Sequence, residues 1–141
     1  MITGLAHAAI TVGNMERSLA FYRDLLGFQV VRTKDLSTGG GKIVMLDIAG
    51  RGELELFQRS NTRPVPEGYG LPETIGLYHL ALEVDDVQTE WERLEAHGVK
   101  SMGVPHYRQP DGSRCAHFYD PDGVVVELIE PSSKWWPNDV G

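Results

Sequence analysis

The sequence predicts an α+β fold of 141 residues in one domain, built from two βαβββ modules. Two observations lead to this prediction. The same order of strand and helix patterns occurs twice along the chain, and matching residues of the two copies stand 72 positions apart. We place module 1 at about residues 4–60 and module 2 at about residues 77–131, joined by a linker at 61–76 and followed by a tail at 132–141.

Module 1 opens with a short apolar run that is typical of a strand, residues 5–12. Asn14 can then cap a helix, in which apolar residues recur on one face until Gly27 ends it. Three further strand patterns complete the module, the second of them after a glycine turn, at residues 28–33, 39–50 and 52–58.

Module 2 repeats this order. A strand pattern at residues 77–84 precedes Asp86, a second candidate helix cap, and the helix again ends at a glycine, Gly98. The motif Asp-Pro-Asp-Gly near the end of the module is typical of a type I turn, with proline second and glycine fourth. The remaining strand patterns lie at residues 98–104, 112–119 and 124–130.

Composition excludes several classes of function. A net charge of −7 without a cluster of Lys or Arg argues against nucleic-acid binding, and no apolar run approaches the roughly 20 residues of a membrane span. The single cysteine, Cys115, excludes an internal disulfide framework. The first residues also lack the basic and apolar regions of a signal peptide, so we expect a cytoplasmic protein.

Histidine and glutamate occur at matching positions of the two modules. His7 and His79 are each third in their strand, and Glu55 and Glu127 each follow 48 residues later in the last strand of the module. Glu127 interrupts the apolar run GVVVELIEP, where a carboxylate without a partner would cost several kcal/mol or be neutralised. The repeat therefore indicates a common partner that compensates the negative charge of both glutamates.

The predicted partner of the two glutamates is one divalent metal ion. If the modules pack about a pseudo-two-fold axis, His7, Glu55, His79 and Glu127 converge on that axis. Two imidazoles and two carboxylates suit Ni²⁺, Zn²⁺, Co²⁺, Mn²⁺ or Fe²⁺ and leave positions open for water or substrate. Glu53 shares a strand face with Glu55, but the 72-residue spacing selects Glu55 as the ligand.

The stretches HAAITVGNMERSLAFYRDLLGF, HLALEVDDV and FYDPDGVVVELIEP, together with the paired modules, resemble the vicinal oxygen chelate superfamily, which includes glyoxalase I. The resemblance covers about residues 5–131 and implies an open, eight-stranded β-cup around the ion. Carried over by residue, it implies metal ligands at His7, Glu55, His79 and Glu127. It also implies a small-molecule substrate and a homodimer.

For activity, the resemblance implies a metal-dependent lyase or isomerase of the glyoxalase I type. Glu55 or Glu127 would leave the ion and move the α-proton of a hemithioacetal, while the metal stabilises the enediolate. Thr11 stands where glutathione-dependent relatives carry arginine, and Arg59 where they carry asparagine, so glutathione recognition is not expected to follow the family pattern.

Three other functions are compatible with the resemblance. One is a methylmalonyl-CoA epimerase, although those relatives usually have glutamine where this chain has Glu55. An extradiol ring-cleaving dioxygenase would use His7, His79 and Glu127 as a facial triad on iron, although such enzymes normally carry a second similar domain. A drug-binding protein of the bleomycin resistance type is the third alternative, but those relatives lack the full set of ligands.

Four positions are candidates for substrate contact: Thr11, Arg59, Glu83 and Arg108. Arg108 could hold an anionic group of the substrate, or belong to a solvated loop formed with His106 and Tyr107. Glu83 lies four residues after His79 on the same strand face, so it borders the cavity or ends the strand in solvent.

Other conspicuous residues have structural explanations. If the final turn pairs Tyr119 with Val124, His117 points away from Glu127 and has a structural role. His97 is placed at a helix end, where a protonated imidazole suits the helix dipole. Trp135 and Trp136 would cover a core edge or a dimer surface, or close over the mouth of the cup.

Overall fold

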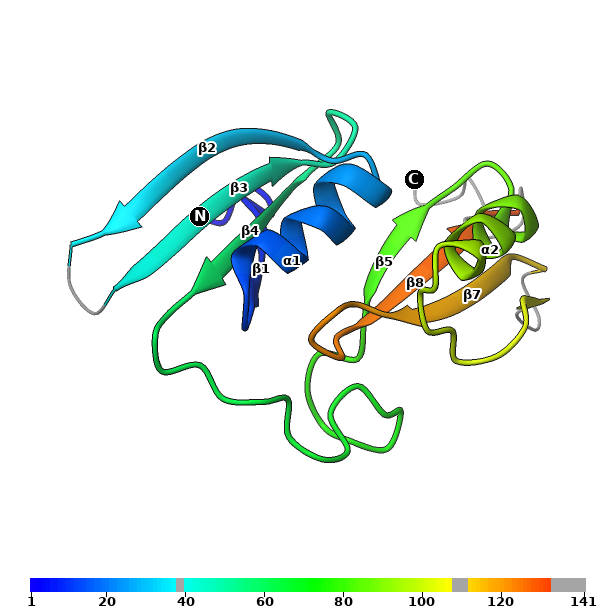
Figure 1. Ribbon diagram of the computed structural model, residues 1–141. Coiled ribbons are helices and arrows are strands. Elements are labelled where there is room, and N and C mark those ends of the chain that lie inside the picture. The colour runs from blue at the N-terminus through cyan, green and yellow to red at the C-terminus, as the bar shows by residue number, and fades with distance from the viewer. Residues whose placement is uncertain (38–39, 108–111, 133–141) are drawn as a thin grey trace. The chain divides into compact units, whose positions relative to one another are not determined.

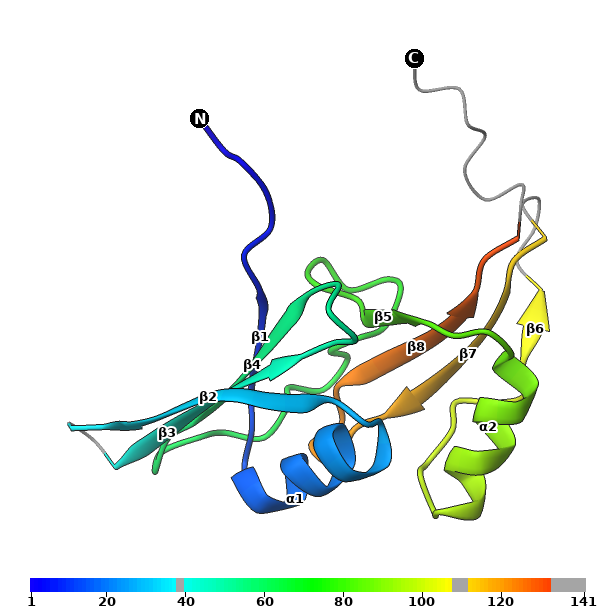
Figure 2. The ribbon, with the colours of Figure 1, turned by 90° about the horizontal axis from the view of Figure 1, so that it is seen from above.

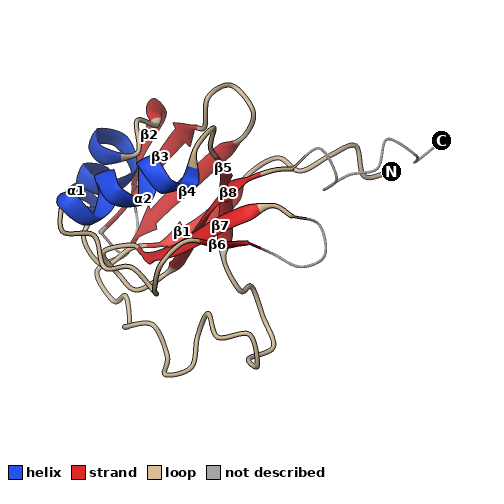
Figure 3. Ribbon diagram, turned by 90° about the vertical axis from the view of Figure 1, so that its right-hand side faces the viewer, coloured by secondary structure: helices blue, strands red, loops and turns tan. Residues whose placement is uncertain are grey.

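The computed structural model describes residues 1–37, 40–107 and 112–132. The chain divides into two compact units, Met1–Pro64 and Val65–Gly141. Within the described residues each unit contains one four-stranded sheet with a helix against it (Figure 1). The loop that joins the last strand of the first unit to the first strand of the second contains no helix or strand (Figure 3).

The first unit has the strand order β1-β4-β3-β2. β1 and β4 are parallel, while β3 is antiparallel to both of its neighbours. The helix between β1 and β2 begins as an α-helix and continues as a π-helix (Figure 2). The elements are β1 (Ala8–Thr11), α1 (Met15–Leu19), η1 (Ala20–Leu25), β2 (Gln29–Leu36), β3 (Gly41–Asp47) and β4 (Glu53–Gln58).

The second unit has the corresponding strand order, β5-β8-β7-β6. β5 and β8 are parallel, and β7 is antiparallel to both β8 and β6. Its elements are β5 (Leu80–Glu83), α2 (Val87–Ala96), β6 (His106–Tyr107), β7 (Arg114–Tyr119) and β8 (Val125–Glu130). The α+β fold of two βαβββ modules is therefore confirmed.

The two units also share their strand register. Ala9 lies opposite Glu55 in the first parallel pair, and Ala81 lies opposite Glu127 in the second. Ala81 stands 72 positions after Ala9, and Glu127 stands 72 positions after Glu55, which is also the spacing between the two histidines. The spacing therefore records a true structural repeat.

Both helices begin at the predicted caps. Oδ1 of Asn14 and Oδ1 of Asp86 each accept a hydrogen bond from the backbone N–H three residues later, at 2.9 Å and 2.7 Å. The bond from Thr89 N–H also lowers the pKa of the Asp86 carboxyl below its usual value. Within the described part of the chain, none of the helices has the length and apolar character needed to cross a membrane.

Apolar side chains fill the layer between each sheet and its helix. In the second unit, one face of β8 and β7 buries alternate residues that pack towards α2, because strand side chains alternate between faces. Each valine, leucine or phenylalanine side chain of this layer contributes about 1.5–3 kcal/mol when it is fully buried. The residues of this layer are Leu82, Val87, Leu94, Ala116, Phe118, Val126 and Leu128.

The second strand of the second module differs from its prediction. Residues 98–104 form no strand apart from an isolated bridge between Ser101 and Phe118. Instead His106 and Tyr107, which were expected in a loop, form β6 and pair with Cys115 and Arg114. The difference arises because strand formation at this edge depends on pairing with β7 and not on local apolar pattern.

The predicted orientation of His117 is wrong. Tyr119 pairs with Val125 and not with Val124, so His117 lies directly opposite Glu127 on the same face of the sheet. The turn residues cause this shift: the backbone N–H of Asp120 donates to the carbonyl of Val124, which keeps residues 120–124 within the connection. A shift of one residue in register moves every side chain of a strand to the other face.

The side chain of Asp120 holds this connection together, which makes it a test of the register. Its Oδ1 accepts hydrogen bonds from the backbone N–H groups of Asp122 and Val124, at 2.9 Å and 2.7 Å. We expect Asp120→Ala to lower the free energy of unfolding by about 1–3 kcal/mol, because two part-buried donors lose their acceptor. Urea denaturation followed by circular dichroism measures this loss.

The matched control is Asp120→Asn, which retains an acceptor oxygen at the same position and should be destabilised less than the alanine variant. Equal losses of stability in the two variants would show that the side-chain acceptor does not hold the turn.

Candidate metal centre

The first unit brings His7 and Glu55 together. His7 immediately precedes β1, two residues before Ala9, which is the strand partner of Glu55. Alternation along the strand therefore places the imidazole and the carboxylate on one face. Nε2 of His7 lies 3.7 Å from Oε2 of Glu55, and the two side chains are 38% and 20% exposed.

The second unit forms the same pair in a tighter arrangement. His79 precedes β5 by one residue and reaches Glu127 on β8 through the equivalent register. Nε2 of His79 lies 2.8 Å from Oε2 of Glu127, which is the distance of a hydrogen bond. The glutamate side chain is only 1% exposed, so its carboxylate is buried against the imidazole.

His117 is the third residue of this cluster in the second unit. Nε2 of His117 lies 3.6 Å from Oε1 of Glu127, and the rings of His117 and His79 are 5.6 Å apart. Glu127 is thus flanked by two imidazoles, which explains how a carboxylate is accommodated inside an apolar strand. Sequence reasoning missed His117 because its face depended on the turn register; alternation along β7 in the observed register identifies it.

The chemistry of this cluster fits a divalent metal ion. His79, His117 and Glu127 each offer one ligand atom, and these atoms lie within 4.8 Å of one another. Imidazole nitrogen and carboxylate oxygen are suitable ligands for first-row divalent ions. Nδ1 of His79 is buried and has no hydrogen-bond partner among the described residues, so the ring is incompletely satisfied by the protein alone.

The predicted substrate-contact residues have differing surroundings. Thr11 is exposed at the end of β1, and Glu83 is exposed at the end of β5. Arg59 is exposed, and its guanidinium lies 5.1 Å from the centre of the Phe57 ring, where a cation–π contact is favourable. Arg108, Trp135 and Trp136 lie outside the described residues.

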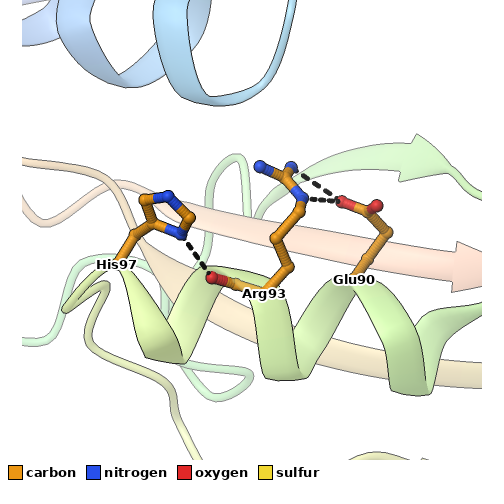
Figure 4. Close-up of polar contacts among 3 residues, drawn as sticks. All are labelled: Glu90, Arg93 and His97. Atoms are coloured by element: carbon orange, nitrogen blue, oxygen red, sulfur yellow. Dashed lines mark hydrogen bonds and ion pairs between the residues drawn. The ribbon is translucent and has the colours of Figure 1, made fainter.

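Two other polar residues have structural partners. Glu53 on β4 forms an ion pair with Arg32 on β2, across the intervening strand β3. His97 lies at the end of α2, where Nδ1 donates to the carbonyl oxygen of Arg93 at 2.8 Å (Figure 4). Arg93 in turn pairs with Glu90 at 2.8 Å. The prediction that His97 sits at a helix end is confirmed.

Comparisons with known proteins agree with this fold. The sequence model of the Glyoxalase/Bleomycin resistance protein/Dioxygenase superfamily matches residues 4–128. A probable lactoylglutathione lyase from Synechocystis sp. is 30% identical over 130 residues, which are 92% of this chain and 97% of that protein. A catechol-2,3-dioxygenase from Bacillus subtilis is 30% identical in an alignment of 143 positions that covers 94% of this chain and 44% of that protein.

A solved structure is also similar. The crystal structure of a glyoxalase family protein from Enterococcus faecalis aligns with a TM-score of 0.77 and 29% identity, covering 90% of this chain and 97% of that chain. The resemblance identified from the sequence motifs is confirmed. The chain belongs to the glyoxalase/bleomycin resistance protein/dioxygenase superfamily.

Proposed function

We propose that the protein is a divalent-metal-dependent lyase or isomerase of the glyoxalase I type, which acts on a small substrate bearing neighbouring oxygen atoms. The observation that supports this most strongly is the repeated His–Glu pair, formed at the same strand register in both units. The similarity to a probable lactoylglutathione lyase from Synechocystis sp. supports the same class of reaction.

In this proposal His7, Glu55, His79 and Glu127 hold one ion, drawn from Ni²⁺, Zn²⁺, Co²⁺, Mn²⁺ and Fe²⁺. When bound, the ion supplies Lewis acidity that lowers the energy of negative charge on a substrate oxygen. The two histidines serve as fixed ligands. The substrate-contact positions Thr11 and Arg59 differ from the glutathione-dependent pattern, so the proposal does not include glutathione as the required thiol.

One of the two glutamates also carries a proton in this proposal. A carboxylate oxygen of Glu55 or Glu127 would remove the proton from the carbon next to a substrate carbonyl and return it to the neighbouring carbon. The two side chains differ in setting: Glu55 is 20% exposed and 3.7 Å from His7, whereas Glu127 is 1% exposed and 2.8 Å from His79. Parallel substitutions can therefore separate proton transfer from structural support.

We expect Glu55→Gln and Glu127→Gln each to lower kcat/KM for a methylglyoxal–thiol hemithioacetal, because glutamine cannot act as a base. For the glutamate that carries the proton the loss should be about 10²- to 10⁴-fold, the usual contribution of general acid–base catalysis. Glu53→Gln is the matched control, since Glu53 lies on the same strand face two residues before Glu55.

Thermal unfolding of the same variants provides the second measurement, and the loss of catalysis should exceed the loss of stability. If both glutamine variants keep wild-type turnover, the assignment of the proton shuttle is wrong, whereas Glu53→Gln should keep it in either case.

Metal content tests the ligand set directly. We expect purified protein, loaded in turn with each of the five candidate ions and dialysed, to retain a divalent ion, and His79→Ala to retain one ion fewer per chain because an imidazole ligand is removed. His97→Ala is the control, since His97 bonds to its own helix. Elemental analysis by mass spectrometry provides the readout; failure of wild-type protein to retain any of the ions would favour a metal-free binding protein.

A second candidate function is extradiol ring cleavage. His79, His117 and Glu127 bring two imidazoles and one carboxylate together within a single unit, which is the ligand set of non-haem iron oxygenases. The similarity to a catechol-2,3-dioxygenase from Bacillus subtilis supports this alternative. Oxygen uptake by the Fe²⁺-loaded protein with catechol, measured beside the hemithioacetal assay, discriminates between the two reactions.

A further inference from the structure

We propose that His106, Cys115 and His117 form a second metal site, which takes a thiophilic cation such as Zn²⁺. These residues are called the thiol–imidazole trio below. None of the four ligands assigned in the proposed function belongs to it, so the inference goes beyond that function.

The strand register brings the trio together. His106 on β6 lies directly opposite Cys115 on β7, and His117 follows two residues later on the same face. Sγ of Cys115 lies 3.3 Å from Nε2 of His106, while the rings of His106 and His117 lie 5.8 Å apart at an angle of 14°. The ligand atoms of the trio all lie within 4.8 Å of one another.

These separations are close to those of a bound site. Zinc binds sulfur at about 2.3 Å and imidazole nitrogen at about 2.0–2.1 Å in tetrahedral geometry, so its ligand atoms lie roughly 3.3–3.8 Å apart. The distance from Cys115 to His106 already falls in this range. The other two pairs of ligand atoms lie within 4.8 Å, and rotation of the imidazoles would have to bring them closer.

Burial leaves the trio accessible from one side. Cys115 is completely buried, the side chain of His117 is 12% exposed, and His106 is exposed. A buried thiol by itself commonly behaves as a small apolar side chain. The exposed imidazole beside Cys115 gives a cation a route of entry, and a fourth coordination position remains for water.

The repeat shows that the fold does not require these residue types. The first unit has the same ladder pairing, in which Lys34 lies opposite Ile43, and Met45 follows two residues later. Each of these residues stands 72 positions before its counterpart in the trio. Side chains without an imidazole or a thiol therefore occupy the same sheet positions, and the three metal-ligating side chains are a departure specific to the second unit.

Cobalt provides a test that does not depend on activity. We expect full-length protein titrated with Co²⁺ to develop the near-ultraviolet thiolate-to-cobalt charge-transfer absorption, because Cys115 is the single cysteine of the chain. The absorption should disappear in Cys115→Ala. In His106→Ala the affinity should fall by about 10-fold or more, because even outer-shell partners contribute that much.

His97→Ala and His7→Ala serve as controls and should keep the absorption at wild-type strength. Because His106 is exposed, its substitution also tests the trio without opening the core. Absence of the absorption in wild-type protein, or wild-type titration by His106→Ala, would overturn the proposal.

The measurements distinguish failure of the thiol–imidazole trio from failure of the four-ligand site. Co²⁺ bound without charge-transfer absorption, and lost in His7→Ala, would overturn the thiol–imidazole trio and leave the proposed function intact. An absorption that persists while His7→Ala and Glu55→Gln retain all of their metal would support the trio and count against the four-ligand site.

Discussion

Parallel pairing between the first and last strand of each unit decides where the candidate ligands lie. It places Ala9 opposite Glu55 and Ala81 opposite Glu127, so the histidine two residues upstream shares the face of the glutamate. The opposite face of each sheet packs against the helix, because the apolar side chains of that face are buried there. A polar cluster and an apolar core can therefore occupy the same short strands without conflict.

The two His–Glu pairs differ in how far they are buried. The carboxylate of Glu127 is removed from water and is flanked by His79 and His117, whereas the pair in the first unit is looser and partly exposed. A buried charge is tolerated only with close partners, so each imidazole around Glu127 has a structural as well as a chemical role. Substitutions in the second unit should consequently combine effects on stability and on the site.

The second unit has potential metal ligands at three sheet positions where the first unit has other residue types. At the sheet positions where the first unit has Lys34, Ile43 and Met45, the second has His106, Cys115 and His117. The backbone pairing is conserved between the units while the chemistry differs. Such a difference between equivalent positions is informative because both experience nearly the same backbone environment.

Much of the fold and of the candidate site could be predicted from the sequence alone. The rest depended on pairing between strands that are distant in the sequence. Local signals predicted the two modules and both helix caps, because capping and apolar periodicity act within a few residues. The 72-residue spacing between the modules predicted the two histidines and two glutamates as candidate metal ligands. The face of His117 and the existence of β6 were not predictable in this way. They depend on hydrogen bonds around Asp120 and on pairing with β7, and only the tertiary structure decided them, since one residue of register exchanges the two faces of a strand.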